Sequence, residues 1–171
     1  GTIQDADDGN PIVTTLPTVV SGFSLSGQKT IVIDGVRPQV SSVTSTVTPN
    51  GDYMTGETVT LEVVFSEVVN VALGSPQLTL ETGASDGVAT YNGVGSGTTT
   101  LSFTYTVSAG EESADLDTHA TTPLSLAGST IQDDAGNDAS LTLPGFPFSL
   151  AGDKDIVIDG TVAIATLVTS Q

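Results

Sequence analysis

The chain has 171 residues, with 20 acidic and only 3 basic side chains, which give a formal net charge of −17 at pH 7. Nucleic acids and anionic membrane surfaces bind clustered Lys and Arg, so this charge makes both poor partners. The chain has no cysteine, which excludes disulfides, and no apolar run reaches the length of a membrane span. We therefore expect neither nucleic-acid binding nor membrane insertion.

Residues 1–35 contain two short apolar runs, at 12–16 and 30–33, separated by clusters of Gly and Asp. A two-stranded hairpin of this size is only marginally stable by itself, so it needs a partner sheet. Two alternatives are open. The segment completes a domain in another chain, or it packs against the domain that follows it.

Alternation of apolar and polar residues predicts most of the strands between residues 36 and 160. Every second residue of 57–65 and of 99–107 is apolar, so one face of each strand is expected in a core. Strands are expected at 39–47, 57–65, 77–81, 87–91, 99–107, 124–131, 140–143 and 155–158, with turns at 49–52 and 93–97. The predicted core contains Val59, Leu61, Val63, Phe65, Leu78, Leu80, Leu101, Phe103 and Tyr105.

No segment has helical periodicity, and one helical turn within 111–116 is the most helix that we expect. Thr, Ser, Val and Gly dominate the composition; β-branched residues favour pleated strands, and Gly favours turns. Seven or eight short strands separated by turns are typical of two antiparallel sheets packed face to face. The sequence therefore predicts an all-β sandwich.

One segment of the chain occurs twice. SLSGQKTIVIDG at 24–35 recurs as SLAGDKDIVIDG at 149–160, which is 125 positions later. Upstream, TIQDADDGN at 2–10 is similar to TIQDDAGN at 130–137. A period of this length fits a tandem array of whole domains. We predict the last strands of one repeat at 1–35, a complete repeat at 36–160, and the first strand of a following repeat at 161–171.

An ordered series of segments across residues 36–160 resembles the bacterial immunoglobulin-like repeats of very large secreted adhesins. The series is GETVTLEVVFSEVVNV, QLTLETG, GVATYNGVGSGTTTLSFTYTVSAGEESADLD, PLSLAGSTIQDDAGNDASLTL and the closing VIDG, and its last part recurs within 1–35. The resemblance implies an immunoglobulin-like antiparallel β-sandwich of tandem-repeat type, which spaces an adhesive tip away from the cell. The chain departs from the pattern at 162–164, where a Pro-containing linker like Arg37-Pro38 is expected.

The resemblance also implies calcium at the junctions between repeats, and the charge favours the same ion. Crowded carboxylates repel one another until cations neutralise them, and Ca²⁺ takes several oxygen ligands. The predicted ligands come from an Asp-rich turn and from the junctions: Asp34, Glu67, Asp133, Asp134, Asn137 and Asp159. Further oxygen donors occur in the first copy of the turn and in an acidic loop: Asp5, Asp7, Asp8, Asn10, Glu111, Glu112, Asp115 and Asp117. The alternatives are an Asx turn, whose side chain bonds its own backbone, and an acidic surface that serves only solubility or halophily.

We predict no enzymatic activity. The only histidine is His119, in the acidic loop, and the sequence assigns it no partner. With no Cys and one His, a zinc site lacks its usual ligands. Carboxylates within 111–117 could form a glycosidase pair. However, aromatic residues are only 5% of the chain and Trp is absent, so a sugar-binding platform is difficult to build.

Three functions are compatible with these observations. The first is a structural module of a secreted or cell-surface fibre, whose partners are adjoining repeats. The second is a subunit of a self-assembling filament, in which residues 1–35 complete a neighbouring copy by strand addition, with Ile31 and Ile33 facing inward like Ile156 and Ile158. The third is a carbohydrate-binding module, which the lack of aromatic residues disfavours.

Overall fold

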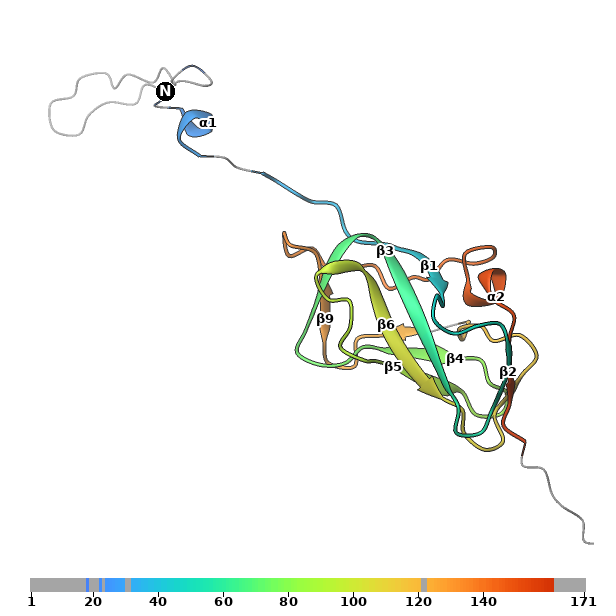
Figure 1. Cartoon of the computed structure of the whole chain (residues 1–171). Coiled ribbons are helices and arrows are strands. Elements are labelled where there is room, and N and C mark those ends of the chain that lie inside the picture. The colour runs from blue at the N-terminus through green and yellow to red at the C-terminus, as the bar shows by residue number, and fades with distance from the viewer. Residues whose placement is uncertain (1–17, 19–21, 23, 30–31, 121–122, 162–171) are drawn as a thin grey trace, which may run out of the picture. The chain divides into compact units, whose positions relative to one another are not determined.

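The computed structural model describes residues 18, 22, 24–29, 32–120 and 123–161, and the chain divides into two compact units, Gly1–Asp34 and Gly35–Gln171. The described part of the second unit, 35–120 and 123–161, is called the β domain below. Strands dominate it, so the all-β prediction is confirmed (Figure 1).

The larger of two sheets forms most of the β domain. Its strands run in the order β1 (Val40–Thr44), β3 (Thr58–Ala72), β6 (Thr98–Thr106), β5 (Gly87–Tyr91), β4 (Gln77–Leu80) and β8 (Leu124–Ser125), and β9 (Thr130–Gln132) pairs with β3. All of these pairs are antiparallel. The smaller sheet has the order β2 (Gly51–Met54), β10 (Ile156–Asp159) and β7 (Glu112–Ser113).

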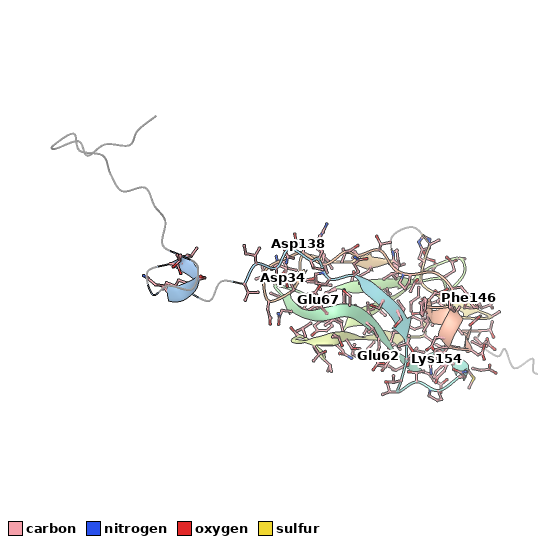
Figure 2. The ribbon with its side chains drawn as sticks, turned by 90° about the horizontal axis from the view of Figure 1, so that it is seen from above. Asp34, Glu62, Glu67, Asp138, Phe146 and Lys154 are labelled. Atoms are coloured by element: carbon pink, nitrogen blue, oxygen red, sulfur yellow. The ribbon has the colours of Figure 1, made fainter. Side chains whose placement is uncertain are left out.

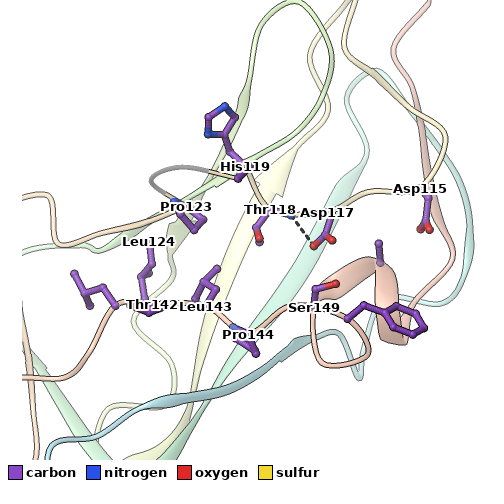
Figure 3. Close-up of a pocket in the computed structure, with 15 residues that line it drawn as sticks. Asp115, Asp117, Thr118, His119, Pro123, Leu124, Thr142, Leu143, Pro144 and Ser149 are labelled. Carbon is purple, nitrogen blue, oxygen red and sulfur yellow. Dashed lines mark hydrogen bonds between the residues drawn. The ribbon is translucent and has the colours of Figure 1, made fainter.

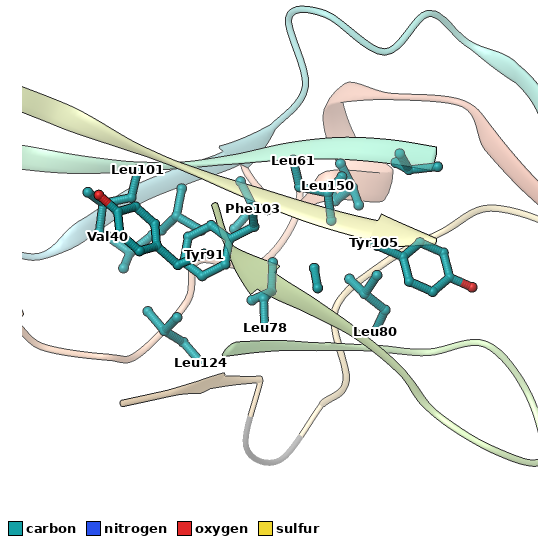
Figure 4. Packing of buried hydrophobic residues seen from close by; sticks show 14 of the residues in the cluster. Val40, Leu61, Leu78, Leu80, Tyr91, Leu101, Phe103, Tyr105, Leu124 and Leu150 are labelled. Atoms are coloured by element: carbon teal, nitrogen blue, oxygen red, sulfur yellow. The ribbon is translucent and has the colours of Figure 1, made fainter. Parts of the chain in front are cut away.

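The core is covered by one face of β3 and β6, neighbouring strands on which every second residue is buried. Leu61 is the cross-strand partner of Phe103, and Val59 is that of Tyr105. All nine predicted core residues are buried, with at most 3% of each exposed. The Phe103 ring also meets Tyr91 edge-on, with ring centroids 5.9 Å apart. Figure 4 shows these side chains between β3 and β6 on one side and β4 on the other, so the sheet curls around its own core.

The smaller sheet differs from the predicted arrangement of wholly antiparallel sheets, because β2 and β10 are parallel. These strands are far apart in the sequence, so no hairpin turn imposes a direction on them. Residues 49–52 were expected to form only a turn. Instead, Gly51 begins strand β2, and its N–H donates to the Asp155 carbonyl at 3.0 Å.

Other local expectations were also wrong. Helix was expected only within 111–116, but single helical turns form at 25–28 and 150–153. Residues 111–116 form no helical turn, because their backbone groups bond other strands: the Glu112 N–H donates to Thr82 O at 3.0 Å, and the Leu116 N–H donates to Ile156 O at 2.7 Å. Residues 140–143 form no strand, and only Ser140 makes a bridge, to Gln39. The expected strand 124–131 is divided into β8 and β9.

The repeated segment forms the same local structure in both copies. Helix α1 (Leu25–Gln28) and helix α2 (Leu150–Asp153) are single turns, and each is preceded by an N-cap serine in an extended conformation. Each is closed by a lysine N–H that donates to the carbonyl of the first helical residue at 2.9 Å. The two copies are offset by the same 125 positions in sequence and in structure.

The surroundings of the two copies differ. Leu150 is fully buried and Ile158 is 2% exposed, whereas their counterparts Leu25 and Ile33 are 68% and 91% exposed. The second copy lies in the β domain, where β10 pairs with β2 and β7. Ile33 therefore does not face inward within a single chain, and its burial stays a prediction for an assembled form. Ile31 lies outside the described residues.

The chain enters and leaves the β domain at opposite ends (Figures 1 and 2). At the entry, Arg37 Nε donates to Asp138 O at 2.9 Å, beside the end of β9. At the exit, Thr55 Oγ1 donates to Gly160 O at 3.0 Å, just before β3 begins. The 15 residues of β3 run between these ends. At about 3.3 Å per residue they determine the long dimension of the domain.

The two copies provide a matched pair for measuring core packing. Leu150→Ala should lower the free energy of unfolding of the β domain by roughly 2–5 kcal/mol, because it leaves a cavity beside β1 and β10. Leu25→Ala makes the same chemical change at an exposed position and should alter it by less than about 0.5 kcal/mol. Urea unfolding of both variants measures the difference. Equal losses would mean that Leu25 is also buried in solution.

Candidate metal centre

The Asp-rich turn after β9 is organised around the Asp133 carboxylate, which is 7% exposed. Its Oδ1 accepts from the backbone N–H groups of Ala135 and Asn137, both at 2.8 Å, and its Oδ2 accepts from Asn137 Nδ2 at 2.8 Å. Gly136, at φ +88°, donates its N–H to the Asp133 carbonyl at 3.2 Å. This is the Asx-type turn that was the alternative to a calcium loop.

The same hydrogen bonds control the charge of Asp133. Burial acts to raise the pKa of the carboxyl, but bonds from the Asn137 side chain and from the backbone of Asn137, Ala135 and Gly136 favour the ionised form. The net effect is a pKa below the ordinary value. Asp133 is therefore a fixed negative charge at neutral pH.

Two more predicted ligands also have structural partners. Asn137 is the amide donor to Asp133, and Asp134 Oδ1 accepts from Asn70 Nδ2 on β3 at 2.7 Å. The neighbouring Asp138 accepts from Gln132 Nε2 at 2.9 Å. The side chains of the turn thus hold the turn together and attach it to β3.

Glu67 is a predicted ligand of the β domain that lies close to Asp133. It lies on β3, in a stretch where the register with β6 shifts between Val64 and Val69. Such a bulge re-aims side chains. A carboxylate oxygen of half-buried Glu67 lies within 4.8 Å of one of Asp133. Figure 2 shows Glu67 at the same end of the β domain as Asp138.

This pair fits calcium only in part. Ca²⁺ takes 6–8 oxygen ligands at 2.3–2.6 Å, so oxygens on opposite sides of the ion are about 5 Å apart. The separation between Glu67 and Asp133 is compatible with that spacing. Two carboxylates supply only part of the coordination shell, so backbone carbonyls or water would have to complete it.

Asp159 lies at the other end of the domain, after β10. Its Oδ1 accepts from the Thr161 N–H at 3.1 Å and from the Thr161 hydroxyl. These two bonds lower the pKa of Asp159. In the small sheet it stands opposite Glu112. Asp34, the other predicted junction ligand, is exposed and belongs to the first unit.

The acidic loop is not a cluster of ligands either. Glu111 is buried, and its Oε2 accepts from the Tyr105 hydroxyl and the Ser108 N–H, both at 2.6 Å. Burial, together with the hydrogen bond and charge of Glu111, raises the pKa of Tyr105. Burial and the nearby charges of Asp155 and Asp117 raise the pKa of Asp115. Asp5, Asp7, Asp8 and Asn10 lie outside the described residues.

A cavity of about 840 Å³ opens beside this loop (Figure 3). Asp115 and Asp117 line one part of it, and Leu143 and Phe146 line another. Among the described residues, Phe146 is the only Phe, Tyr or Trp that lines the cavity, and it is 82% exposed. The described lining therefore offers little support for the carbohydrate-binding alternative.

The structure also assembles a group that sequence reasoning missed. His119 Nε2 lies 3.6 Å from Asp86 Oδ2 and 3.9 Å from Glu81 Oε2. Glu81 and Asp86 lie close together in the sequence, at the end of the hairpin of β4 and β5, whose last pair is Leu80 and Gly87. His119 is distant in the sequence, and only the pairing of its segment with β4 brings it to them.

No protein-family model, curated protein or solved structure matches the chain. Over the residues that the structure describes, no helix is long and apolar enough to cross a bilayer. The function is therefore inferred from the residues and their geometry.

Asp133 should make the β domain sensitive to acid. Because its pKa is lower when folded, its contribution to stability is present above the unfolded pKa of about 3.9 and is lost as the pH falls through the folded value. Asp133→Asn should therefore be less stable than the wild type at pH 7, and the difference should shrink toward about pH 2. Urea unfolding across this range measures it, with Asp52→Asn, on exposed β2, as the charge-matched control. A constant difference at every pH would contradict the assignment.

Proposed function

We propose that the chain is a structural module of an extracellular bacterial fibre, an immunoglobulin-like β-sandwich that recurs in tandem and holds an adhesive tip away from the cell. The observation that carries the proposal is the position of the two ends of the β domain. The chain enters beside Asp138 and leaves at Gly160, at the opposite end. If modules are joined end to end in this way, each one lengthens the fibre by the long dimension of one β domain.

The recurrence of 24–35 at 149–160 supports the same proposal. Both copies form the same helical turn, and in the second copy the following residues become β10. The packing of Gly160 shows how closely that copy fits. A Cβ on Gly160 would meet Ser108 O at 2.4 Å, whereas a Cβ on Gly35 would meet nothing within 4 Å. In a tandem array, the first copy would be the end of the preceding module and would have matching neighbours.

Calcium is part of this proposal as a stiffening ion. The excess carboxylates of the chain repel one another. Two of them, on Glu67 and Asp133, lie close together at the entry end of the domain. A divalent cation there would remove that repulsion. As a spacer, the module needs no reaction chemistry, and we propose no enzymatic activity.

The length of an array tests the spacer function. Residues 36–160 are to be expressed as one, two and three copies in direct succession, so that Gly160-Val36 reproduces the natural Gly35-Val36 junction. Small-angle X-ray scattering should show a maximum dimension that rises linearly, on the order of 50 Å per copy, as expected from the length of β3. A dimension that grows much more slowly would indicate modules that fold back on one another and would contradict a spacer.

Calcium should raise the melting temperature. The full chain should melt at a higher temperature in millimolar CaCl₂ than in chelator, because an ion that binds only the folded state stabilises it by mass action. Glu67→Gln should reduce that gain, and Asp52→Asn should leave it unchanged. Identical melting curves with and without calcium would leave the carboxylates as a solubilising surface only.

A second candidate, the self-assembling filament subunit, is favoured by the exposure of Val32 and Ile33, at 83% and 91%. Their counterparts Val157 and Ile158 lie in β10. An exposed apolar segment with strand-forming sequence is a template for association with another copy. If the chain is a filament subunit, light scattering should show assembly that disappears on deletion of residues 1–35, while the β domain stays folded. A full chain that is monomeric at every concentration would exclude it.

A further inference from the structure

We propose that Glu81, Asp86 and His119 form a binding site for a divalent transition-metal ion, with Zn²⁺ as the best fit. The site is separate from the calcium proposal, because it uses a nitrogen ligand and lies at the end of the β4–β5 hairpin rather than on the turn after β9. The chain lacks the Cys and the several His of the usual zinc sites, and here two carboxylates take their place beside the single imidazole. Glu81 follows β4, Asp86 precedes β5, and His119 lies in the segment that pairs with β4 on its other side. All three side chains face outward.

The first pair is set by the ladder between β4 and the loop that contains His119. The His119 N–H donates to Thr79 O, and the Glu81 N–H donates to Asp117 O, both at 2.9 Å. These two hydrogen bonds flank an antiparallel bridge between Leu80 and Thr118. Leu80 is fully buried. Because successive side chains of a strand point to opposite faces, Glu81 points outward, and His119 is its diagonal neighbour on that face.

The second pair is set by the hairpin of β4 and β5. Leu80 is the partner of Gly87, so the next pair outward in the same register is Glu81 and Asp86. The loop between them is held by buried Thr82, whose Oγ1 accepts from the Gly87 N–H at 2.7 Å and donates to Ser85 O at 2.9 Å. Asp86 is therefore held in place beside Glu81 rather than free to turn away.

The charges explain why a cation suits this place. Two carboxylates directly opposite each other on neighbouring strands destabilise a sheet. Here Glu81 and Asp86 come directly beyond the last printed pair of the hairpin, Leu80 and Gly87, in a chain of net charge −17. The imidazole nitrogen of His119 lies 3.9 Å from the first carboxylate and 3.6 Å from the second. A divalent ion would replace this repulsion by two attractive contacts.

The geometry and the donor atoms indicate which ion. Ligands 2.0–2.1 Å from a tetrahedral zinc ion are about 3.3 Å from one another. His119 Nε2 is 3.6 Å and 3.9 Å from the two carboxylate oxygens, and all three donor atoms lie within 4.8 Å of one another. Small side-chain rotations would close this triangle around an ion. The side chains are 30–55% exposed, so water can fill the fourth position, and imidazole favours zinc over calcium or magnesium.

Zinc binding to the full chain tests the site, and His119 is a direct reporter because it is the only histidine. Calorimetry with ZnCl₂ in calcium-free buffer should show one site, and the imidazole nitrogen signals of the ¹⁵N-labelled chain should shift in proportion to the zinc added. His119→Gln should weaken binding at least about tenfold, as should Glu81→Gln and Asp86→Asn. Asp52→Asn and Glu67→Gln remove carboxylates elsewhere and should leave the affinity unchanged.

Two outcomes would overturn the site. If His119→Gln binds ZnCl₂ as tightly as the wild type, the ion is held by acidic groups elsewhere. If the imidazole signals stay in place when one equivalent of zinc is bound, His119 is not a ligand, whatever the variants do. Because the reporter signal belongs to the wild type, the second result does not depend on whether any variant folds. A loss of the calcium effect in Glu67→Gln with zinc binding intact would separate this site from the proposed calcium site.

Discussion

The long strand β3 is the element on which the rest of the β domain depends. It pairs with β1 and β6 along its first part and with β9 at its end. Its alternating residues line the core from Val59 to Phe65. The same 15 residues separate the entry of the chain from its exit. A domain built on one continuous strand is elongated along that strand, and this shape makes a spacing function physically reasonable.

The repeated segment shows how much of a strand depends on its neighbours. Both copies form a serine-capped helical turn, because that turn is closed by bonds within a few residues. Strand β10 forms in the second copy, where β2 and β7 offer backbone groups on both sides. In the first copy, described residues 32–35 form no strand. A strand satisfies its backbone only through partners, so identical residues need not adopt the same structure.

The negative charge of the chain is arranged by strand register as well as by composition. Glu81 and Asp86 come directly beyond the last pair of their hairpin, Leu80 and Gly87, and Glu112 stands opposite Asp159 in the small sheet. Other acidic side chains are held in place by local hydrogen bonds, as Asp133 is in its turn and Glu111 is beside Tyr105. Strand pairing therefore decides which carboxylates become neighbours, and local hydrogen bonds decide which of them are fixed in place.

The sequence by itself determined the class of fold, the main strands and the core, because a period of two along 57–65 and 99–107 specifies which side chains face inward. It also determined that 24–35 recurs at 149–160, but the helical turn in each copy was not predicted, because neither copy has helical periodicity. Only the tertiary structure decided that β2 runs parallel to β10, that 140–143 stays out of the sheets, and that Asp159 lies far from Asp133. It also decided that His119 meets Glu81 and Asp86. These features depend on pairing between segments distant in the chain, and no local pattern of residues records such pairing.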